Sequence, residues 1–327
     1  MSSPAGTDGN ERQRPPSWRR RLARYVVLFG LVPYLSIVVV FAVAQRRFLY
    51  PREQVASIDA ADAYFSAGRL HDVAIDTHDS LRLRGWLALA DGLELQSDES
   101  LRDGLDGNHF VVLYFPGNSG NRLDRVHDCR DLTGIQCDVL LFDYRGYGDN
   151  PGSPNEEDLA ADAWSAWNYL TQELGVPPQR IVVFGESLGG GVATRLAERA
   201  CSTDASPAAL VLSSTFSSMV DTVSWHYPYF PVRLMLLDRY PSADYISRVN
   251  CSVLILHGTS DDFVPLELSR KLFAAAPSES AIGIAKRFVE VPHAGHNAIS
   301  PTVLREELRM LLEQTTAARR RAKEDQE

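Results

Sequence analysis

Continuous apolar runs alternate with amphipathic stretches along most of the chain. Uninterrupted runs of this kind are typical of strands that are buried on both faces of a parallel sheet. The clearest are residues 109–117 and 138–144, and further predicted strands lie at 180–185, 208–214, 252–258 and 286–292. Between them, apolar residues recur every three or four positions, as in helices. These stretches are 121–133, 155–174, 187–200, 266–276 and 301–317. The pattern predicts an α/β fold with a mostly parallel, doubly wound sheet.

Two segments depart from this alternation. Residues 72–90 alternate apolar and polar positions, which predicts a β-hairpin. Residues 216–250 lie between two predicted strands and are rich in aromatic residues and proline. Ligands of such sheets bind beyond the carboxyl ends of the strands, where this insertion must lie. The insertion is either a cap over a pocket or an ordinary packed excursion. As a cap, it would line an apolar site with Trp225, Tyr227, Tyr229, Phe230, Leu234, Met235 and Leu236.

The most apolar run of the chain, residues 25–44, contains 20 residues and no charge. A helix of that length spans about 30 Å, the thickness of the hydrocarbon core of a bilayer. A buried helix of a soluble protein is one alternative, but the run is apolar on every face. A cleaved signal peptide is another, because "AVA" at 42–44 fits a cleavage site. The run is long for a signal peptide, however, and Arg46 and Arg47 follow at once. We therefore expect an uncleaved membrane anchor.

The formal net charge of −9 is unevenly distributed. Residues 1–24 carry six arginines against Asp8 and Glu11, about +4, which leaves about −13 for the remainder. An acidic body argues against a nucleic-acid partner, because phosphates require neutralising cations. Six arginines precede the apolar run and only three follow it closely. The positive-inside rule then places the N-terminus in the cytoplasm and the body on the non-cytoplasmic (periplasmic or extracytoplasmic) side.

The cysteines give no indication of a metal site. Cys129, Cys137, Cys201 and Cys251 form no CxxC pair and no Cys/His cluster, and the histidines show no metal-ligand spacing. We expect neither a metal nor a cofactor. An even number of cysteines in an exported body permits two disulfides. Four buried free thiols are the alternative.

The clearest chemical signal is the stretch Gly185-Glu186-Ser187-Leu188-Gly189, a G-x-S-x-G motif. It follows a predicted strand and opens a predicted helix. In this setting the chain turns sharply and presents the serine hydroxyl at the N-terminus of the helix. The helix dipole there favours the negative charge that develops during acyl transfer. The motif therefore predicts that Ser187 is a nucleophile.

A serine nucleophile needs a base and an acid that orients the base. In this architecture both follow the serine, acid first, each directly after a strand. After the strand at 252–258 come Asp261 and Asp262, and after the strand at 286–292 come His293 and His296. The order Ser, Asp, His is therefore present, with two candidates at each of the last two positions.

Taken together, these motifs resemble the membrane-anchored α/β-hydrolases, a group of serine hydrolases that includes bacterial proteins and depalmitoylase- and lysophospholipase-like proteins. Such chains often carry the label serine-aminopeptidase-like. The resemblance covers residues from about 50 to 315. Its segments are "FLYP" (48–51), "FPGNSGN" (115–121), "FDYRGYGDNPGSPNEEDLAADA" (142–163), "GESLGGGVA" (185–193), "LHGTSDDFVP" (256–265) and "AGHN" (294–297).

The resemblance implies an α/β-hydrolase fold and chooses among the candidates. It places a catalytic triad at Ser187, Asp261 and His296. It assigns an oxyanion hole to the backbone N–H groups of Asn118 and Leu188. Two such donors can each contribute on the order of 3 kcal/mol to transition-state stabilisation.

Two further implications concern residues outside the triad. Pro116 stands where the family has a histidine before Gly117, which puts the internal hydrogen bonding of this loop in question. The strand order of the family also places the cysteines in pairs at the amino-terminal edge of the sheet. This placement suggests disulfides 129–137 and 201–251.

We therefore predict a single-pass membrane serine hydrolase that cleaves a carboxylic ester or thioester, with a lipid-like acyl substrate. One alternative is an aminopeptidase-like enzyme, with Glu186 as a ligand for the substrate amine. The other is a non-catalytic binding protein with the same fold. The expected organisation is a basic arm (1–24), a transmembrane helix (25–44), an α/β-hydrolase domain (45–316, with 216–250 as a possible cap) and a polar tail (317–327).

Overall fold

The computed structural model describes residues 18–66, 68–95, 101–105, 107 and 109–324. The chain divides into two compact units, Met1–Gln45 and Arg46–Glu327. Residues 1–17 of the predicted basic arm and 325–327 of the predicted tail lie outside the described residues.

One long helix contains the apolar run. It consists of α1 (Trp18–Val26), a π-helical turn (Val27–Leu31) and α2 (Val32–Leu49). The π turn lies just before Pro33, whose missing N–H cannot bond to the carbonyl one turn back. The whole segment, Trp18–Leu49, is long and apolar enough to cross a membrane. This property fits a single-pass membrane protein.

Eight strands form one sheet in the second unit. They are β1 (Leu70–Asp76), β2 (Arg82–Ala88), β3 (Phe110–Phe115), β4 (Cys137–Phe142), β5 (Ile181–Glu186), β6 (Ala209–Ser213), β7 (Ser252–Gly258) and β8 (Arg287–Val291). Their order across the sheet is β1-β2-β4-β3-β5-β6-β7-β8. The predicted hairpin, β1 and β2, joins the sheet antiparallel to β4, and the other neighbours are parallel. The predicted fold class, an α/β-hydrolase fold with a mostly parallel sheet, is thus confirmed.

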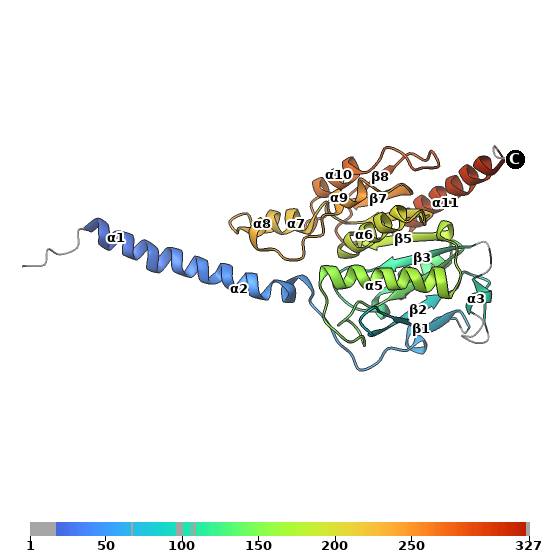
Figure 1. The fold of residues 1–327 in the computed structure, drawn as a ribbon, viewed down its shortest axis with the longest axis horizontal. Helices are drawn as coiled ribbons and strands as arrows, with labels where there is room; N and C mark the ends of the chain where they lie inside the picture. The colour runs from blue at the N-terminus through green and yellow to red at the C-terminus, as the bar shows by residue number, and fades with distance from the viewer. Residues whose placement is uncertain (1–17, 67, 96–100, 106, 108, 325–327) are drawn as a thin grey trace, which may run out of the picture. The chain divides into compact units, whose positions relative to one another are not determined.

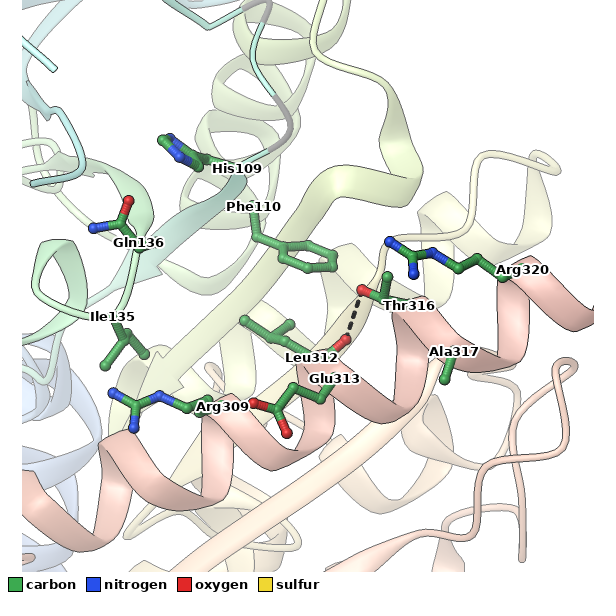
Figure 2. Close-up of a pocket in the computed structure, with 10 residues that line it drawn as sticks. All are labelled: His109, Phe110, Ile135, Gln136, Arg309, Leu312, Glu313, Thr316, Ala317 and Arg320. Atoms are coloured by element: carbon green, nitrogen blue, oxygen red, sulfur yellow. Dashed lines mark hydrogen bonds between the residues drawn. The ribbon is translucent and has the colours of Figure 1, made fainter. Parts of the chain in front are cut away.

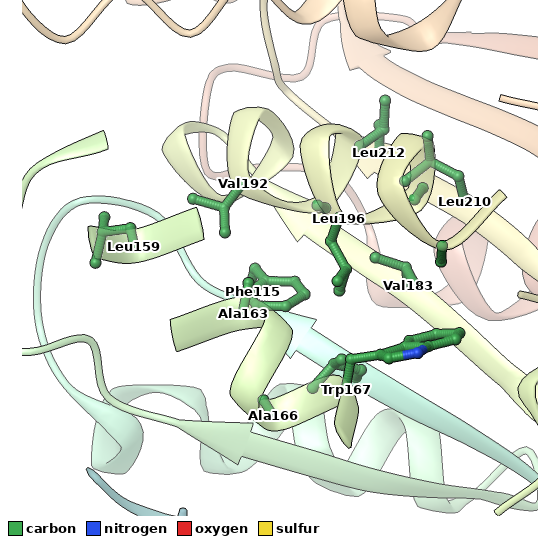
Figure 3. Close-up of a cluster of buried hydrophobic side chains, with 14 of the residues drawn as sticks. Phe115, Leu159, Ala163, Ala166, Trp167, Val183, Val192, Leu196, Leu210 and Leu212 are labelled. Carbon is green, nitrogen blue, oxygen red and sulfur yellow. The ribbon is translucent and has the colours of Figure 1, made fainter. Parts of the chain in front are cut away.

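Helices cover both faces of the sheet (Figure 1). α5 (Glu156–Asn168), α6 (Leu188–Ser202) and α10 (Leu266–Ala275) pack on one face, while α4 (Val126–Thr133) and α11 (Pro301–Glu324) pack on the other. Alternate residues of the central strands face the two layers, which explains their uninterrupted apolar pattern. Figure 3 shows Val183, Leu210 and Leu212 in the cluster beneath α6, with Trp167 of α5.

Shorter elements complete the second unit. They are α3 (Leu101–Gly104), α7 (Met219–His226), α8 (Val232–Met235), α9 (Ser242–Ile246), a π-helical turn (Tyr169–Glu173) and 3-10 turns at Ala60–Ala63, Arg122–Arg125 and Pro178–Arg180. α11 continues to Glu324, beyond the predicted end of the helix at residue 317. The segment after 317 is rich in alanine, arginine and lysine, which are good helix formers, and Ala318 is buried against the sheet.

The two suggested disulfides are not present. All four cysteines are free and buried. Cys129 and Cys137 pack in the apolar layer between the sheet and α11. Burial there raises the pKa of the Cys137 thiol to about 12, and oxidation requires the thiolate. The interaction between Cys201 and Cys251 lowers the pKa of Cys201 to about 6 and raises the pKa of Cys251.

Candidate active site

Ser187 occupies a strained turn between β5 and α6. Its backbone angles are φ 52° and ψ −115°, a conformation that a residue with a side chain rarely adopts. A Cβ at Gly185 would lie 2.5 Å from the carbonyl oxygen of Gly189, and a Cβ at Gly189 would clash with the carbonyl oxygen of Phe115. The two glycines of the motif therefore let α6 approach the ends of β5 and β3. This packing fixes the serine at the carboxyl edge of the sheet.

Three of the predicted residues form one chain of hydrogen bonds. Nε2 of His296 lies 3.0 Å from Oγ of Ser187. On the other side of the ring, Nδ1 of His296 lies 2.8 Å from Oδ2 of Asp261. The serine is 6% exposed and the aspartate side chain is fully buried, so water has little access to the bonds between them.

The structure distinguishes between the paired candidates in each loop. Asp262 and His293 are both exposed and neither takes part in this chain of hydrogen bonds. His293 has φ 60°, and its backbone N–H donates to Oγ1 of Thr259. The carbonyl oxygen of His296, in contrast, accepts a hydrogen bond from Oγ of Ser214 at 2.8 Å.

The carboxylate of Asp261 is held by donors on several sides. Oδ1 accepts hydrogen bonds from the backbone N–H groups of Phe263 and Val264 at 2.9 and 2.8 Å. Oδ2 faces His296 and also lies 3.3 Å from Nε2 of the buried His257. Burial acts to raise the pKa of Asp261, but hydrogen bonds from both histidines and from the backbone outweigh it. The pKa therefore lies well below its usual range, so the carboxylate stays ionised.

A cavity of about 230 Å³ opens directly over Ser187 and His296. Its walls come from the loop after β3, here called the β3 loop (residues 116–121), and from Arg125, Glu186, Phe263 and Asn297. Asn118 and Leu188, the predicted oxyanion donors, flank the nucleophile from the β3 loop and from the first turn of α6. Asn118 also lines the cavity, and Leu188 directly follows the nucleophile along the chain.

The β3 loop keeps its shape without the histidine that Pro116 replaces. The carbonyl oxygen of Pro116 accepts a hydrogen bond from the hydroxyl of Tyr144 at 2.9 Å. The carbonyl oxygen of Asn118 accepts one from Tyr147, also at 2.9 Å. Both tyrosines follow β4, so a neighbouring loop supplies the bonding.

A buried arginine connects the same two loops from below. Arg122 is 0% exposed and donates to Asp143 at 2.5 Å and to Asp149 at 2.6 Å. Its guanidinium also lies 5.3 Å from the ring centre of Trp86. Because charges without partners are very costly inside a protein, this cluster fixes the position of the β3 loop relative to the loop after β4.

A charged group that the sequence pattern did not indicate lines the cavity. Arg125 comes from the turn before α4. A Cβ atom added at Gly117 would lie 3.9 Å from Nη2 of Arg125 and 3.7 Å from Cβ of Ser187, so both side chains border the same space. Nε of Arg125 is buried without a hydrogen-bond partner and lies 3.6 Å from Glu186. Glu186 also accepts a hydrogen bond from Tyr114 at 2.9 Å. The carboxylate of Glu186 is thus already paired with Arg125 and Tyr114. This pairing weakens the aminopeptidase alternative, in which Glu186 would bind the amine of the substrate.

The sequence left the insertion at 216–250 as either a cap or an ordinary packed excursion, and none of its described residues lines this cavity. The lining residues that the structure describes come from other loops, and the insertion instead exposes Trp225 and Leu234, at 61% and 89%. Its His226 contacts the edge of the site, where Nε2 lies 2.8 Å from the carbonyl oxygen of Phe263. The ring of Phe263 lies 4.9 Å from that of His296. The short helices of the insertion turn their apolar residues outward because their inner faces already pack on the sheet layer through Met219, Val220 and Val232.

A larger cavity, of about 420 Å³, lies at the other end of β3 (Figure 2). His109 and Phe110 face the side of α11 that carries Arg309, Leu312 and Arg320. The six residues of β3 span about 20 Å. This cavity therefore lies at the amino edge of the sheet, away from Ser187.

Comparisons with known proteins agree with this geometry. The sequence profile described as alpha/beta hydrolase fold matches residues 111–250. An uncharacterised protein of Mycobacterium tuberculosis (strain ATCC 25618 / H37Rv) is 40% identical over 279 residues, which are 85% of this chain and 89% of that protein. Lysophosphatidylserine lipase ABHD12 of Danio rerio is 31% identical over 239 residues, which are 67% of this chain and 62% of the lipase.

Solved structures share the fold at lower identity. The alpha-beta hydrolase of Vibrio vulnificus superposes with a TM-score of 0.59 at 20% identity and covers 77% of this chain and 81% of its own. The Pyrococcus furiosus esterase Pf2001 gives a TM-score of 0.57 at 18% identity, with 81% and 98% covered. The chain therefore belongs to the α/β-hydrolase superfamily and is a hydrolytic enzyme.

Proposed function

We propose that the protein is a serine hydrolase that cleaves a carboxylic ester or thioester through an acyl-enzyme. The observation that carries the proposal is the continuous hydrogen-bond chain from Ser187 through His296 to Asp261. A serine so placed is activated when the imidazole takes its proton, and the buried carboxylate stabilises the imidazolium that results.

The steps follow from the positions of these groups. Oγ of Ser187 attacks the substrate carbonyl carbon while Nε2 of His296 accepts the hydroxyl proton. The carbonyl oxygen becomes an oxyanion, which the N–H groups of Asn118 and Leu188 would stabilise. His296 then gives the proton to the leaving alcohol or thiol. Water, deprotonated by the same imidazole, releases the acyl group and regenerates the serine.

The cavity supports an anionic single-chain lipid as the substrate. Arg125 is a cation that lines the same cavity as the nucleophile, and its Nη2 and Cβ of Ser187 both border the space beside Gly117. A guanidinium is well suited to bind a phosphate or carboxylate next to the scissile ester. The name of the relative ABHD12, a lysophosphatidylserine lipase, describes a substrate with those groups. We extend that substrate class, a lysophospholipid with an anionic head group, to this chain.

A fluorophosphonate probe tests the mechanism without knowledge of the substrate. The wild-type protein in detergent should be labelled on a single residue, and Ser187→Ala should not be labelled. The matched control is Ser119→Ala, which removes an exposed hydroxyl from the same cavity and should be labelled normally. An unlabelled wild type, or a labelled Ser187→Ala, contradicts the proposal.

The catalytic unit is proposed to lie on the non-cytoplasmic side of the membrane. The excess of arginine before the apolar run at 25–44 supports this orientation. A C-terminal alkaline phosphatase fusion should be active and a C-terminal fluorescent-protein fusion should be dark. The reverse pattern would place the enzyme in the cytoplasm.

A further inference from the structure

The insertion between β6 and β7 carries an unusual concentration of exposed apolar side chains. Together with one residue from the loop after β7 they form a surface here called the α7–α8 face. Its members are Trp225 (61% exposed), Tyr227 (47%), Tyr229 (87%), Leu234 (89%), Leu237 (62%) and Phe263 (50%). Scattered apolar side chains on a surface are ordinary, but a group from so short a segment indicates an interaction surface.

The path of the chain identifies what this surface meets. The apolar run that can cross a bilayer ends at Ala44. Two residues later, about 3 Å along a helix, Arg46 forms an ion pair with Asp238, with Nε–Oδ2 and Nη2–Oδ1 distances of 2.8 and 3.0 Å. Asp238 is buried and directly follows Leu237. Arg46, two residues after the apolar run, is therefore joined by an ion pair to Asp238 within the insertion.

The ion pair of Arg46 and Asp238 lies close to the α7–α8 face along the chain. Leu234 precedes Asp238 by four residues, which even a fully extended chain separates by only about 14 Å. A second contact joins the segment after α2 to the insertion, since the hydroxyls of Tyr50 and Tyr240 are 2.8 Å apart. Arg233, beside Leu234, has a side chain that is 76% exposed. A cation flanking apolar and aromatic residues is the composition of surfaces that bind at the headgroup level of a bilayer.

The same surface is continuous with the cavity over the nucleophile. Phe263 belongs to both, because it is half exposed, lines the cavity and packs against His296. His226, next to Trp225 on α7, contacts the backbone of Phe263. An acyl chain lying against the face would thus meet the opening of the cavity without crossing bulk water.

We propose that the α7–α8 face inserts into the interface of the membrane that the N-terminal helix spans, and that acyl substrates enter the cavity from the lipid. The entry of acyl substrates from the lipid rests on the proposed function, whereas the insertion of the face into the membrane does not depend on catalysis. The occupant of the face is a lipid surface and not a partner protein, because the chain itself brings the bilayer to this point.

Spin labelling of the full chain measures the insertion directly. A nitroxide at Leu234→Cys, in the Ser187→Ala background and in phosphatidylcholine–phosphatidylglycerol bilayers, should relax faster with oxygen than with a water-soluble nickel chelate. The control is a nitroxide at Tyr64→Cys, because Tyr64 is 90% exposed and lies outside the face. It should show the opposite preference. Equal, aqueous behaviour at both positions overturns the proposal whether or not the enzyme cleaves esters.

A second measurement tests entry from the lipid. Leu234→Asp should lower hydrolysis of a long-chain ester embedded in the bilayer about tenfold and leave hydrolysis of soluble p-nitrophenyl acetate unchanged. The unchanged soluble activity shows that the variant folds. Tyr64→Asp should affect neither rate. An equal loss on both substrates, or no loss on either, contradicts entry through this face.

Discussion

The side-chain amide of Asn118 donates a hydrogen bond of 3.0 Å to the carbonyl oxygen of Leu49. Leu49 is the last residue of α2, and Asn118 lines the cavity beside Ser187. Because the carbonyl of Asn118 is held by Tyr147 as well, this residue is fixed on two sides. The segment that follows the apolar helix therefore helps to position the proposed oxyanion donor.

Asn118→Ala should lower kcat on p-nitrophenyl acetate about fivefold with little change in KM. The variant keeps the backbone N–H that would bind the oxyanion but loses the bond to Leu49. A hydrogen bond of this kind contributes about 1 kcal/mol, and about 1.4 kcal/mol corresponds to tenfold in rate. Ser119→Ala, at the neighbouring exposed position, serves as the control and should match wild type. An unchanged kcat in Asn118→Ala would show that the anchor does not position the donor.

Each catalytic candidate has a rejected neighbour that provides a matched control. His296→Asn and Asp261→Asn should each lower kcat on the order of 10⁴-fold, because the base or its orienting acid is lost. His293→Asn and Asp262→Asn change exposed groups in the same loops and should retain activity within about twofold of wild type, since neither contacts the triad. Steady-state kinetics on one soluble ester compares all four. A large loss in either exposed variant would contradict the assignment.

Arg125→Gln should change selectivity more than general activity. A hydrogen bond to a charged group contributes about 1.5–3 kcal/mol, which is roughly 10- to 100-fold in kcat/KM. The loss should appear with a lysophosphatidylserine and not with a monoacylglycerol of the same chain length. Arg125→Lys, which keeps the charge, should retain part of the preference. Equal losses on both lipids would show that Arg125 balances Glu186 and does not contact the substrate.

The sequence predicted those parts of the site that follow directly from strands. Ser187 and Asp261 come after the buried strands β5 and β7, and His296 comes after the partly exposed edge strand β8. Their place at one edge of the sheet therefore follows from the order of predicted strands. Arg125 could not be predicted in this way, because it comes from a turn after β3. Its closeness to Ser187 depends on β3 lying beside β5, and the local pattern carries no information about strand order.

The sequence also did not show whether the apolar side chains of the insertion face the cavity or the solvent. Trp225 and Leu234 suit the wall of a pocket and a lipid-facing surface equally well by composition. Packing decides between them, since Met219 and Val220 already occupy the inner side of α7. The two suggested disulfides were wrong for a related reason. The positions of the cysteines in the sequence do not show how their side chains pack, and in the structure all four are free and buried.

Arg122→Met should destabilise the fold by about 3–5 kcal/mol, because it leaves the buried carboxylate of Asp143 without its cation and leaves Asp149 with Arg84 alone. The control is Arg82→Met. Arg82 forms an exposed pair with Asp76 at 3.9 Å, and pairs of that kind contribute about 0–1 kcal/mol. Chemical denaturation in detergent, followed by tryptophan fluorescence, measures both. Similar stabilities for the two variants would show that the buried cluster is not required to hold the β3 loop.

Asp143 gives a pH dependence of known sign. Burial raises its pKa from 3.8 to about 6, against the opposing effect of Arg122. The native state therefore holds this proton more tightly than the unfolded state does. The stabilisation from the proton is complete below about pH 4 and is lost as the pH rises through 6. Because a tenfold difference in proton affinity corresponds to about 1.4 kcal/mol, the loss amounts to about 3 kcal/mol at most.

Asp143→Asn isolates this contribution, because asparagine resembles the protonated acid and does not titrate. Other groups titrate in both proteins and cancel in the comparison. The Tm of wild type minus that of Asp143→Asn should therefore fall between pH 4 and pH 7, with most of the change between 4 and 6. A difference that is constant or that rises with pH would show that Arg122 keeps Asp143 ionised throughout.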